Sequence, residues 1–248
     1  MEHDEHWIRK EEFGLISSLL PQKKFTFGLE IGAGDGCQSE ALASLCTDFI
    51  STEYHAERMK KRNVKQMQAD VQKLPFSNNQ FDFVYSSNVL EHIPDLHKAF
   101  AELKRVSTPE AFHVHIMPSC WCKVSHVFFY YVKAFHILFS PKKLKKLKEE
   151  KNEKFSKKEK NTDNRYRKSL WQCIFPPIHG AASHHFNEFL SWRKKRWAKL
   201  FLHHDYEIKK IVKMPFYFSA GYDLPKLRKF LNTLGLTSSY AYLVEVKK

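Results

Sequence analysis

The sequence predicts a doubly wound α/β fold, with a mostly parallel sheet of seven strands and an α-helical insertion that caps the sheet after its fifth strand. Three observations predict this fold. Short apolar runs alternate with segments of helical spacing, the first run passes through a glycine-rich turn into a helix, and the rhythm breaks after Ser119. Since ligands of such sheets bind at the carboxyl ends of the strands, the functional site is expected there.

The elements follow in chain order. An amphipathic helix is predicted over residues 7–20. Strands are predicted over 25–31, 48–53, 64–70, 81–87, 111–119, 206–214 and 238–248. Helices are predicted over 37–45, 95–106, 185–205 and 223–234, where the apolar residues have helical spacing. Asp95, directly after Pro94, is placed to cap the helix that follows it.

Length and composition limit the kinds of protein that this sequence can encode. A chain of 248 residues with 43% hydrophobic content can bury one core with an elaborated cap. The charged start lacks the apolar stretch of a secretory signal, so we expect a cytoplasmic protein. The five cysteines are scattered and the fourteen histidines show no HExxH spacing, so we expect neither a disulfide framework nor a metal site.

The net charge of +14 is unevenly distributed. Residues 141–168 contain thirteen Lys or Arg and five Asp or Glu, a net +8. Such a block is either a solvated linker or exposed helix, or a surface that attracts lipid headgroups or nucleic acid. The aromatic stretch before it, over 120–139, is interrupted by Lys and His and is a poor bilayer-spanning segment. Together the two stretches have the pattern of an interfacial anchor, with a lid over the functional site as the equal alternative.

The glycine turn lies in "LEIGAGDGCQSE", residues 29–40. Glycines at alternate positions suit a backbone with positive φ or a ligand in close approach, and the helix after them offers free N–H groups. No lysine followed by Ser or Thr comes after the glycines, which excludes a mononucleotide P-loop. Cys37 stands where a dinucleotide-binding turn has its third glycine, which disfavours NAD or FAD.

With its E-x-G-x-G-x-G spacing and the "LEHIPD" of residues 90–95, the sequence resembles class I S-adenosylmethionine-dependent methyltransferases of the type 11 subgroup with the LEHxPD signature. The resemblance covers about residues 26–119. It implies a Rossmann-like methyltransferase fold, S-adenosylmethionine as cofactor and S-adenosylhomocysteine as product. It also implies a division into the N-terminal helix and cofactor-binding half (1–119), an insertion or lid (120–184) and a C-terminal completion of the sheet (185–248).

The resemblance assigns roles to eleven cofactor-binding residues. Glu30 orients the turn, Glu53 binds both ribose hydroxyls, and Asp70 receives the adenine amino group. The others expected at the cofactor are Gly32, Ala33, Gly34, Gly36, Tyr54, Val71, Ser87 and Asn88. Two plainer interpretations stay open: Glu30 as a surface carboxylate at a strand end, and Asp70 as the cap of a loop.

Methyl transfer from a sulfonium is a direct displacement, so a base is needed only if the acceptor must lose a proton. The candidate bases are His92 and His184, with His179 and His185 beside the latter. Equally, His92 could be a structural histidine beneath the loop, and the cluster could decorate a surface loop.

Three functions follow from these observations. The first is an enzyme that methylates a small-molecule, lipid or saccharide acceptor, at the membrane surface if the anchor exists. The second, suggested by the charge, is an RNA or DNA methyltransferase. Against it, the residues after the fourth predicted strand, from Ser87 to Leu90, lack the Pro-Pro-aromatic pattern of amino-directed enzymes. The third is a protein that binds the cofactor without activity. The acceptor itself cannot be read from a widely shared fold.

Overall fold

The computed structural model describes residues 3–139, 176, 178, 180, 184–218 and 224–247. These residues form one seven-stranded sheet of order β3-β2-β1-β4-β5-β7-β6. The strands are β1 (Phe25–Ile31), β2 (Cys46–Glu53), β3 (Lys65–Gln68), β4 (Phe81–Ser87), β5 (Ser107–Pro118), β6 (Tyr206–Lys213) and β7 (Ser239–Val246). The first five strands are mutually parallel, and β7 pairs antiparallel with both β5 and β6. The predicted fold class is therefore confirmed.

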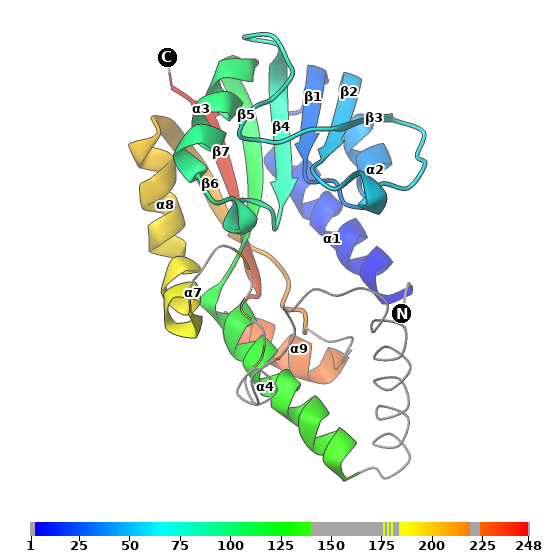
Figure 1. Cartoon of the computed structure of the whole chain (residues 1–248), viewed down its shortest axis with the longest axis vertical. Coiled ribbons are helices and arrows are strands. Elements are labelled where there is room, and N and C mark those ends of the chain that lie inside the picture. Colours follow the sequence, from blue (N-terminus) through cyan, green and yellow to red (C-terminus); the bar gives the residue numbers. More distant parts are fainter. Residues whose placement is uncertain are drawn as a thin grey trace, which may run out of the picture.

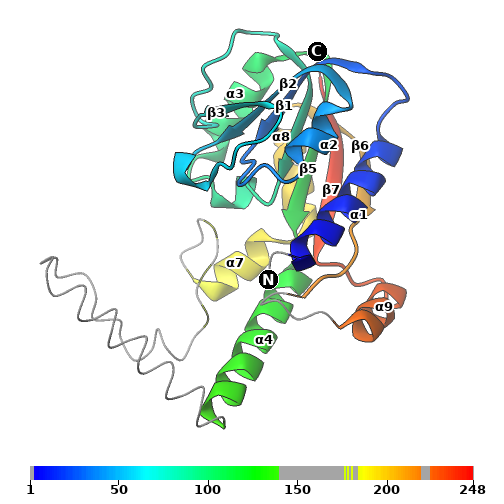
Figure 2. The same cartoon turned by 90° about the vertical axis from the view of Figure 1, so that its right-hand side faces the viewer.

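Helices cover both faces of the sheet, α1 and α2 on one and α3 and α8 on the other (Figures 1 and 2). The described helices are α1 (His3–Leu19), α2 (Ser39–Ala43), α3 (Leu96–Val106), α4 (Cys120–Leu138), α7 (His185–Ser191), α8 (Lys194–His203) and α9 (Pro225–Thr233). Short 3₁₀ turns are η1 (Ala56–Arg58) and η2 (Leu90–His92). As predicted, Asp95 caps α3, since its carboxylate accepts a hydrogen bond from the Lys98 amide at 3.1 Å.

Successive side chains of β4 pack alternately into the cores on the two faces of the sheet. Phe83 and Tyr85 pack on the α1 and α2 side, whereas Val84 packs on the α3 and α8 side. This is the period of two that a strand buried on both faces requires. On α3 the buried residues are Ala99, Phe100, Leu103 and Val106, the spacing of one helical face. The sheet is thus rigid where its strand ends carry the candidate site.

The prediction of one continuous helix over 185–205 was wrong. The chain forms α7 and α8, with extended backbone at Arg193 between them (φ −70°, ψ 132°). Trp192 and Trp197 are both buried. A continuous helix would set these two side chains about 140° apart around its axis, so the break lets both tryptophans reach the interior.

The aromatic stretch over 120–139 forms α4, which leaves the carboxyl end of β5 and runs away from the sheet (Figure 1). Among the described residues, no helix combines the length and hydrophobicity that crossing a bilayer requires. The lysine-rich residues 141–168, with the predictions made for them, lie outside the described part of the chain, as do Cys173 and His179.

Candidate active site at the carboxyl ends of the central strands

The candidate site lies where the order of the strands in the sheet reverses, between β1 and β4. β1 pairs with β2 on one side and with β4 on the other, so the segments that follow β1 and β4 diverge to opposite faces. In open α/β sheets, ligands bind at such a reversal, in the crevice outside the carboxyl ends of the strands. The residues predicted for the cofactor all follow β1, β2, β3 or β4 or lie at their ends.

The glycine turn after β1 has the backbone that only glycine adopts freely. Gly32, Gly34 and Gly36 have φ of 67°, 59° and 73°. A Cβ at Gly32 would clash with the side chain of Val89, so the turn and the loop after β4 touch at this point. The Ala33 amide donates to the carbonyl of Thr52 at 2.9 Å, which holds the turn against β2.

Glu30 lies just before the glycine turn and bonds to the start of α2 and to β2. Its side chain is buried and accepts a hydrogen bond from the Ser39 hydroxyl at the start of α2, and its carbonyl accepts one from Thr52 Oγ1 at 2.8 Å. Burial raises the pKa of Glu30 to about 7, despite the Ser39 hydrogen bond and the positive charge of Arg9. Because Glu30 is 3% exposed, the surface-carboxylate interpretation is wrong.

Glu53, at the end of β2, bonds the glycine turn through one carboxylate oxygen and the chain after β2 through the other. The Gly34 amide donates to Oε2 at 2.8 Å and the His55 amide donates to Oε1 at 3.1 Å. Arg58 Nη1 lies 3.8 Å from Oε1 on an exposed side chain. Glu53 is itself buried, so an acceptor-only carboxylate is fixed beside the glycine turn. The adjacent Tyr54 is exposed.

Asp70 and Val71 follow β3 on the same edge of the sheet. Asp70 Oδ1 accepts a hydrogen bond from the Gln72 amide at 2.8 Å, so its carboxylate caps the loop. It remains partly exposed, with its second oxygen 3.4 Å from Gln72 Nε2. Val71 is buried in the core, and this fixes the position of the loop backbone. Both the capping role and a ligand role are compatible with this arrangement.

The polar side chains at the end of β4 point in two directions. Ser86 is fully buried and bonds His115 Nδ1 at 2.7 Å, so its side chain points into the sheet packing. Ser87 Oγ instead accepts hydrogen bonds from Asn88 Nδ2 at 3.2 Å and from Arg9 Nη1 at 3.0 Å. Asn88 has a φ of 53°, the left-handed conformation that turns the chain out of the strand.

Sequence reasoning missed Arg9. This residue of α1 reaches the end of β4 and also donates to Glu12 Oε2 at 2.8 Å, while Gln38 Nε2 donates to the same oxygen at 3.1 Å. Burial lowers the pKa of Arg9, but Glu12 and the nearby Tyr85 and Tyr217 raise it further, to a value above its usual one. A fixed positive charge therefore stands beside the crevice. In the sequence, Arg9 is one charged residue among several in a predicted amphipathic helix, and nothing there distinguishes it as a site residue.

The "LEHIPD" loop, residues 90–95, follows β4 and begins with η2. The Glu91 side chain is only 5% exposed, and its Oε2 has no hydrogen-bond partner in the described part of the chain. Burial raises the pKa of Glu91 to about 8. His92 is half exposed, with Nε2 3.9 Å from Glu91 Oε1. A Cβ at Gly180 would clash with the Glu91 carbonyl, so Gly180 lies directly against this loop.

A buried ion pair joins α4 to α7 beside the same loop. Lys123 Nζ lies 2.7 Å from Glu188 Oε2, and both side chains are almost fully buried. His184, the second candidate base, is an exposed residue at the start of α7, with Nδ1 3.4 Å from Asn187 Nδ2. His185 Nδ1 lies 4.0 Å from Glu188 Oε2. His184 and His185 therefore lie at the start of α7 near the buried ion pair, and no catalytic contact is established for either of them.

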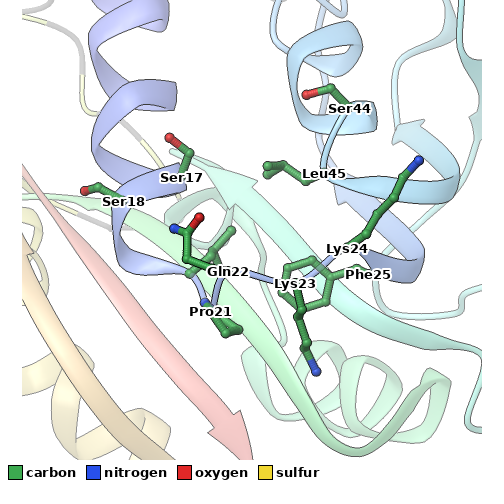
Figure 3. Close-up of a pocket in the computed structure, with 10 residues that line it drawn as sticks. Ser17, Ser18, Pro21, Gln22, Lys23, Lys24, Phe25, Ser44 and Leu45 are labelled. Atoms are coloured by element: carbon green, nitrogen blue, oxygen red, sulfur yellow. The ribbon is translucent and has the colours of Figure 1, made fainter.

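A separate hollow of about 500 Å³ lies at the opposite edge of the sheet (Figure 3). It is bounded by Ser17 and Ser18 at the end of α1, Ser44 and Leu45 after α2, and the segment that leads into β1. This hollow lies at the amino end of β1, away from the glycine turn. It therefore takes no part in the site described above.

Comparison with known proteins agrees with this geometry. Residues 29–114 match the family described as "Methyltransferase domain". An uncharacterised protein of Methanocaldococcus jannaschii is 30% identical over 96 residues, which cover 39% of this chain and 42% of that protein. A probable chloroplastic tocopherol O-methyltransferase of Oryza sativa subsp. japonica is 29% identical over 136 residues, which cover 49% of this chain and 37% of that protein.

The fold extends well beyond the matched segment. The crystal structure of an S-adenosylmethionine-dependent methyltransferase from Mesorhizobium loti superposes with a TM-score of 0.56 and 10% identity, covering 95% of this chain and 97% of that one. The chain nevertheless spans less than half the length of the two curated relatives. Residues 29–114, which carry the glycine turn and the buried acids at the strand ends, therefore match a methyltransferase domain, and the chain has the fold of a class I S-adenosylmethionine-dependent methyltransferase.

Proposed function

We propose that this protein transfers the methyl group of S-adenosylmethionine to a small acceptor bound above the carboxyl ends of β4 and β5. The observation that carries the proposal is Glu53, a buried carboxylate fixed by the Gly34 and His55 amides beside the glycine turn. A carboxylate at this position accepts hydrogen bonds from a ribose diol and repels a phosphate, which favours a nucleoside without phosphates.

The glycine turn supports the same ligand. A Cβ on Gly34 would meet only the end of the exposed Arg58 side chain, at 3.7 Å. The backbone at Gly34 is therefore open to close approach from the crevice side. Asp70 and the Val71 amide would hold the adenine, and Tyr54 would lie beside the ribose. These residues fit the chemical groups of S-adenosylmethionine in the order in which the strands present them.

Arg9 completes the binding site at the amino-acid end. Its guanidinium meets the Ser87 hydroxyl at the end of β4, and Asn88 lies on the other side of that hydroxyl. A guanidinium recognises a carboxylate better than any other side chain does. Arg9 would therefore bind the cofactor carboxylate, while Ser87 and Asn88 bind the amino group.

When bound, the cofactor supplies a methyl group on a sulfonium, which a nucleophile displaces directly. The protein must then hold the acceptor in line and exclude water. The "LEHIPD" loop, with Gly180 against it, would border the acceptor position. His92 and His184 remain candidate bases, and Glu91 joins them, because a carboxyl whose pKa is about 8 exchanges protons near neutral pH.

The acceptor class is a small molecule, a lipid or a saccharide. The tocopherol O-methyltransferase resemblance supports a small, apolar acceptor, although it covers part of each chain. The net charge of +14 favours nucleic acid as the second candidate. A cofactor-binding protein without activity is the third possibility, and the complete set of glycines and acids at the crevice argues against it.

The test uses S-adenosylmethionine with a radioactive methyl group, incubated with the protein and either total lipid extract, polar metabolite extract or total RNA. Label in the lipid or metabolite fraction supports the proposal. Label in RNA would transfer it to the second candidate. The variant Glu53→Ala provides the control for background transfer, since it lacks the proposed ribose contact. Binding of S-adenosylmethionine without transfer to any fraction would favour the inactive protein.

A further inference from the structure

A stripe of exposed apolar side chains runs along the whole of α4. Its members follow the spacing i, i+3, i+7, i+10, i+14 and i+18, which keeps them within an arc of about 80° on the helix surface. Each is between 41% and 72% exposed. The α4 stripe consists of Trp121, Val124, Phe128, Tyr131, Phe135 and Phe139.

Among the described side chains of α4, the buried ones lie in its first half. Lys123, Ser125 and Phe129 are buried, and the ring of Phe129 lies 5.2 Å from that of Phe218. Beyond Phe129 no described side chain of α4 is buried. The helix runs outward from the sheet, as Figures 1 and 2 show. At 1.5 Å per residue, the stripe from residue 121 to residue 139 is about 27 Å long. An exposed apolar surface of this length marks an interaction site.

A second helix presents the same kind of surface at the same end of the molecule (Figures 1 and 2). None of the residues of α9 is buried. Its exposed apolar residues share one face, and cations lie on either side of that face. The α9 face consists of Leu224, Leu227, Phe230 and Leu234, flanked by Lys226 and Arg228.

The charges around these two surfaces have one sign. Neither α4 nor α9 contains an Asp or a Glu, whereas together they contain five Lys or Arg, of which Lys123 is buried against Glu188 and the other four remain. The sequence directly after α4 adds the net +8 of residues 141–168. A second copy of the chain would bring these like charges together at the interface. An anionic bilayer would instead pair them with lipid headgroups, at about 1 kcal/mol for each cation near the surface.

The composition of the stripe also matches a bilayer. Four of its six members are Phe or Tyr and one is Trp, the aromatic residues that partition into the headgroup region. A helix with an apolar face and flanking lysines lies in the plane of that region without crossing it. We propose that the α4 stripe and the α9 face dock this protein onto an anionic lipid surface.

This inference goes beyond the proposed transfer reaction, and its experiment is independent of methyl transfer. The full chain is sedimented with phosphatidylcholine vesicles, with and without an equal share of phosphatidylglycerol, at low and high salt. We expect partition onto the anionic vesicles that high salt weakens. The triple variant Phe128→Ser, Phe135→Ser, Phe139→Ser should lose at least about tenfold in partition coefficient. The matched control Leu202→Ser, at an exposed leucine of α8, should bind as the wild type does.

The folding of the triple variant is checked by circular dichroism and by its affinity for S-adenosylhomocysteine. The double variant Leu227→Ser, Phe230→Ser tests the α9 face independently. The proposal is overturned if the wild type stays in the supernatant or if both variants partition as the wild type does. It is also overturned if neutral vesicles bind equally at either salt concentration. A wild-type dimer that the triple variant converts to a monomer would assign the stripe to a second copy instead.

Discussion

Arg9 of α1 donates a hydrogen bond to the Ser87 hydroxyl at the end of β4, over 3.0 Å and a separation of 78 residues. The contact fixes the amino-terminal helix across the crevice and puts a guanidinium beside the residues predicted to bind the cofactor. Glu12 and Gln38 hold this arrangement from the other side. The amino-terminal helix therefore borders the candidate site as well as the core.

The Arg9 contact predicts a selective loss of affinity. Arg9→Met should weaken the binding of S-adenosylhomocysteine by about 1 to 3 kcal/mol, the effect of losing a hydrogen bond to a charged group. It should leave the affinity for 5′-methylthioadenosine unchanged, because this ligand lacks the amino-acid carboxylate. Titration calorimetry with the two ligands measures both effects, and Lys10→Met on the exposed side of α1 is the matched control. An equal loss for both ligands would show a structural role for Arg9.

Two glycines should respond oppositely to the same substitution. Gly32→Ala puts a Cβ at a φ of 67° and against Val89, so we expect a loss of about 1 to 3 kcal/mol in the free energy of unfolding and weaker cofactor binding. Gly14→Ala lies inside α1 with open space around its Cβ and should stabilise the protein by about 0.5 to 1 kcal/mol. Urea unfolding of both variants decides this, and a neutral Gly32→Ala would refute the described turn.

Glu91 predicts a pH dependence of stability. Its pKa is raised from 4.5 to about 8 by burial, so the folded protein keeps a proton that the unfolded chain releases. The stability of the wild type relative to Glu91→Gln, whose neutral amide mimics the protonated acid, is therefore greatest below pH 4.5. It then falls by about 1.4 kcal/mol per pH unit until pH 8. Urea unfolding at a series of pH values measures the difference. Parallel profiles for wild type and Glu91→Gln would contradict the buried state of Glu91, and the exposed Glu11→Gln should show such a parallel profile.

The buried pair of Lys123 and Glu188 predicts strongly non-additive substitutions. Lys123→Met alone leaves the Glu188 carboxylate buried without its cation and should cost about 3 to 5 kcal/mol in the free energy of unfolding. Adding Glu188→Gln removes that charge, so the double variant should be more stable than Lys123→Met. A double-mutant cycle followed by urea unfolding gives the coupling energy. A cycle that closes additively would show that the pair does not interact.

Most strands were predictable because they are short apolar runs bounded by polar or turn residues, and β4 was predicted to the residue. The same was true of the acids that end β2 and follow β3, since a parallel sheet brings such strand ends together. The antiparallel insertion of β7 between β5 and β6 depends on pairing between distant segments, which periodicity does not encode. Arg9 and the Lys123 and Glu188 pair were missed for the same reason: their partners lie 78 and 65 residues away.

Titration calorimetry of the protein with S-adenosylmethionine tests the central claim most directly. The wild type is predicted to bind, and Glu53→Ala should bind more weakly by about 1 to 3 kcal/mol, because the ribose hydroxyls lose a charged acceptor. Glu57→Ala, an exposed carboxylate on the same loop, should bind as the wild type does. Equal affinity in wild type and Glu53→Ala would remove Glu53 from the site. No binding to the wild-type protein would contradict the account as a whole.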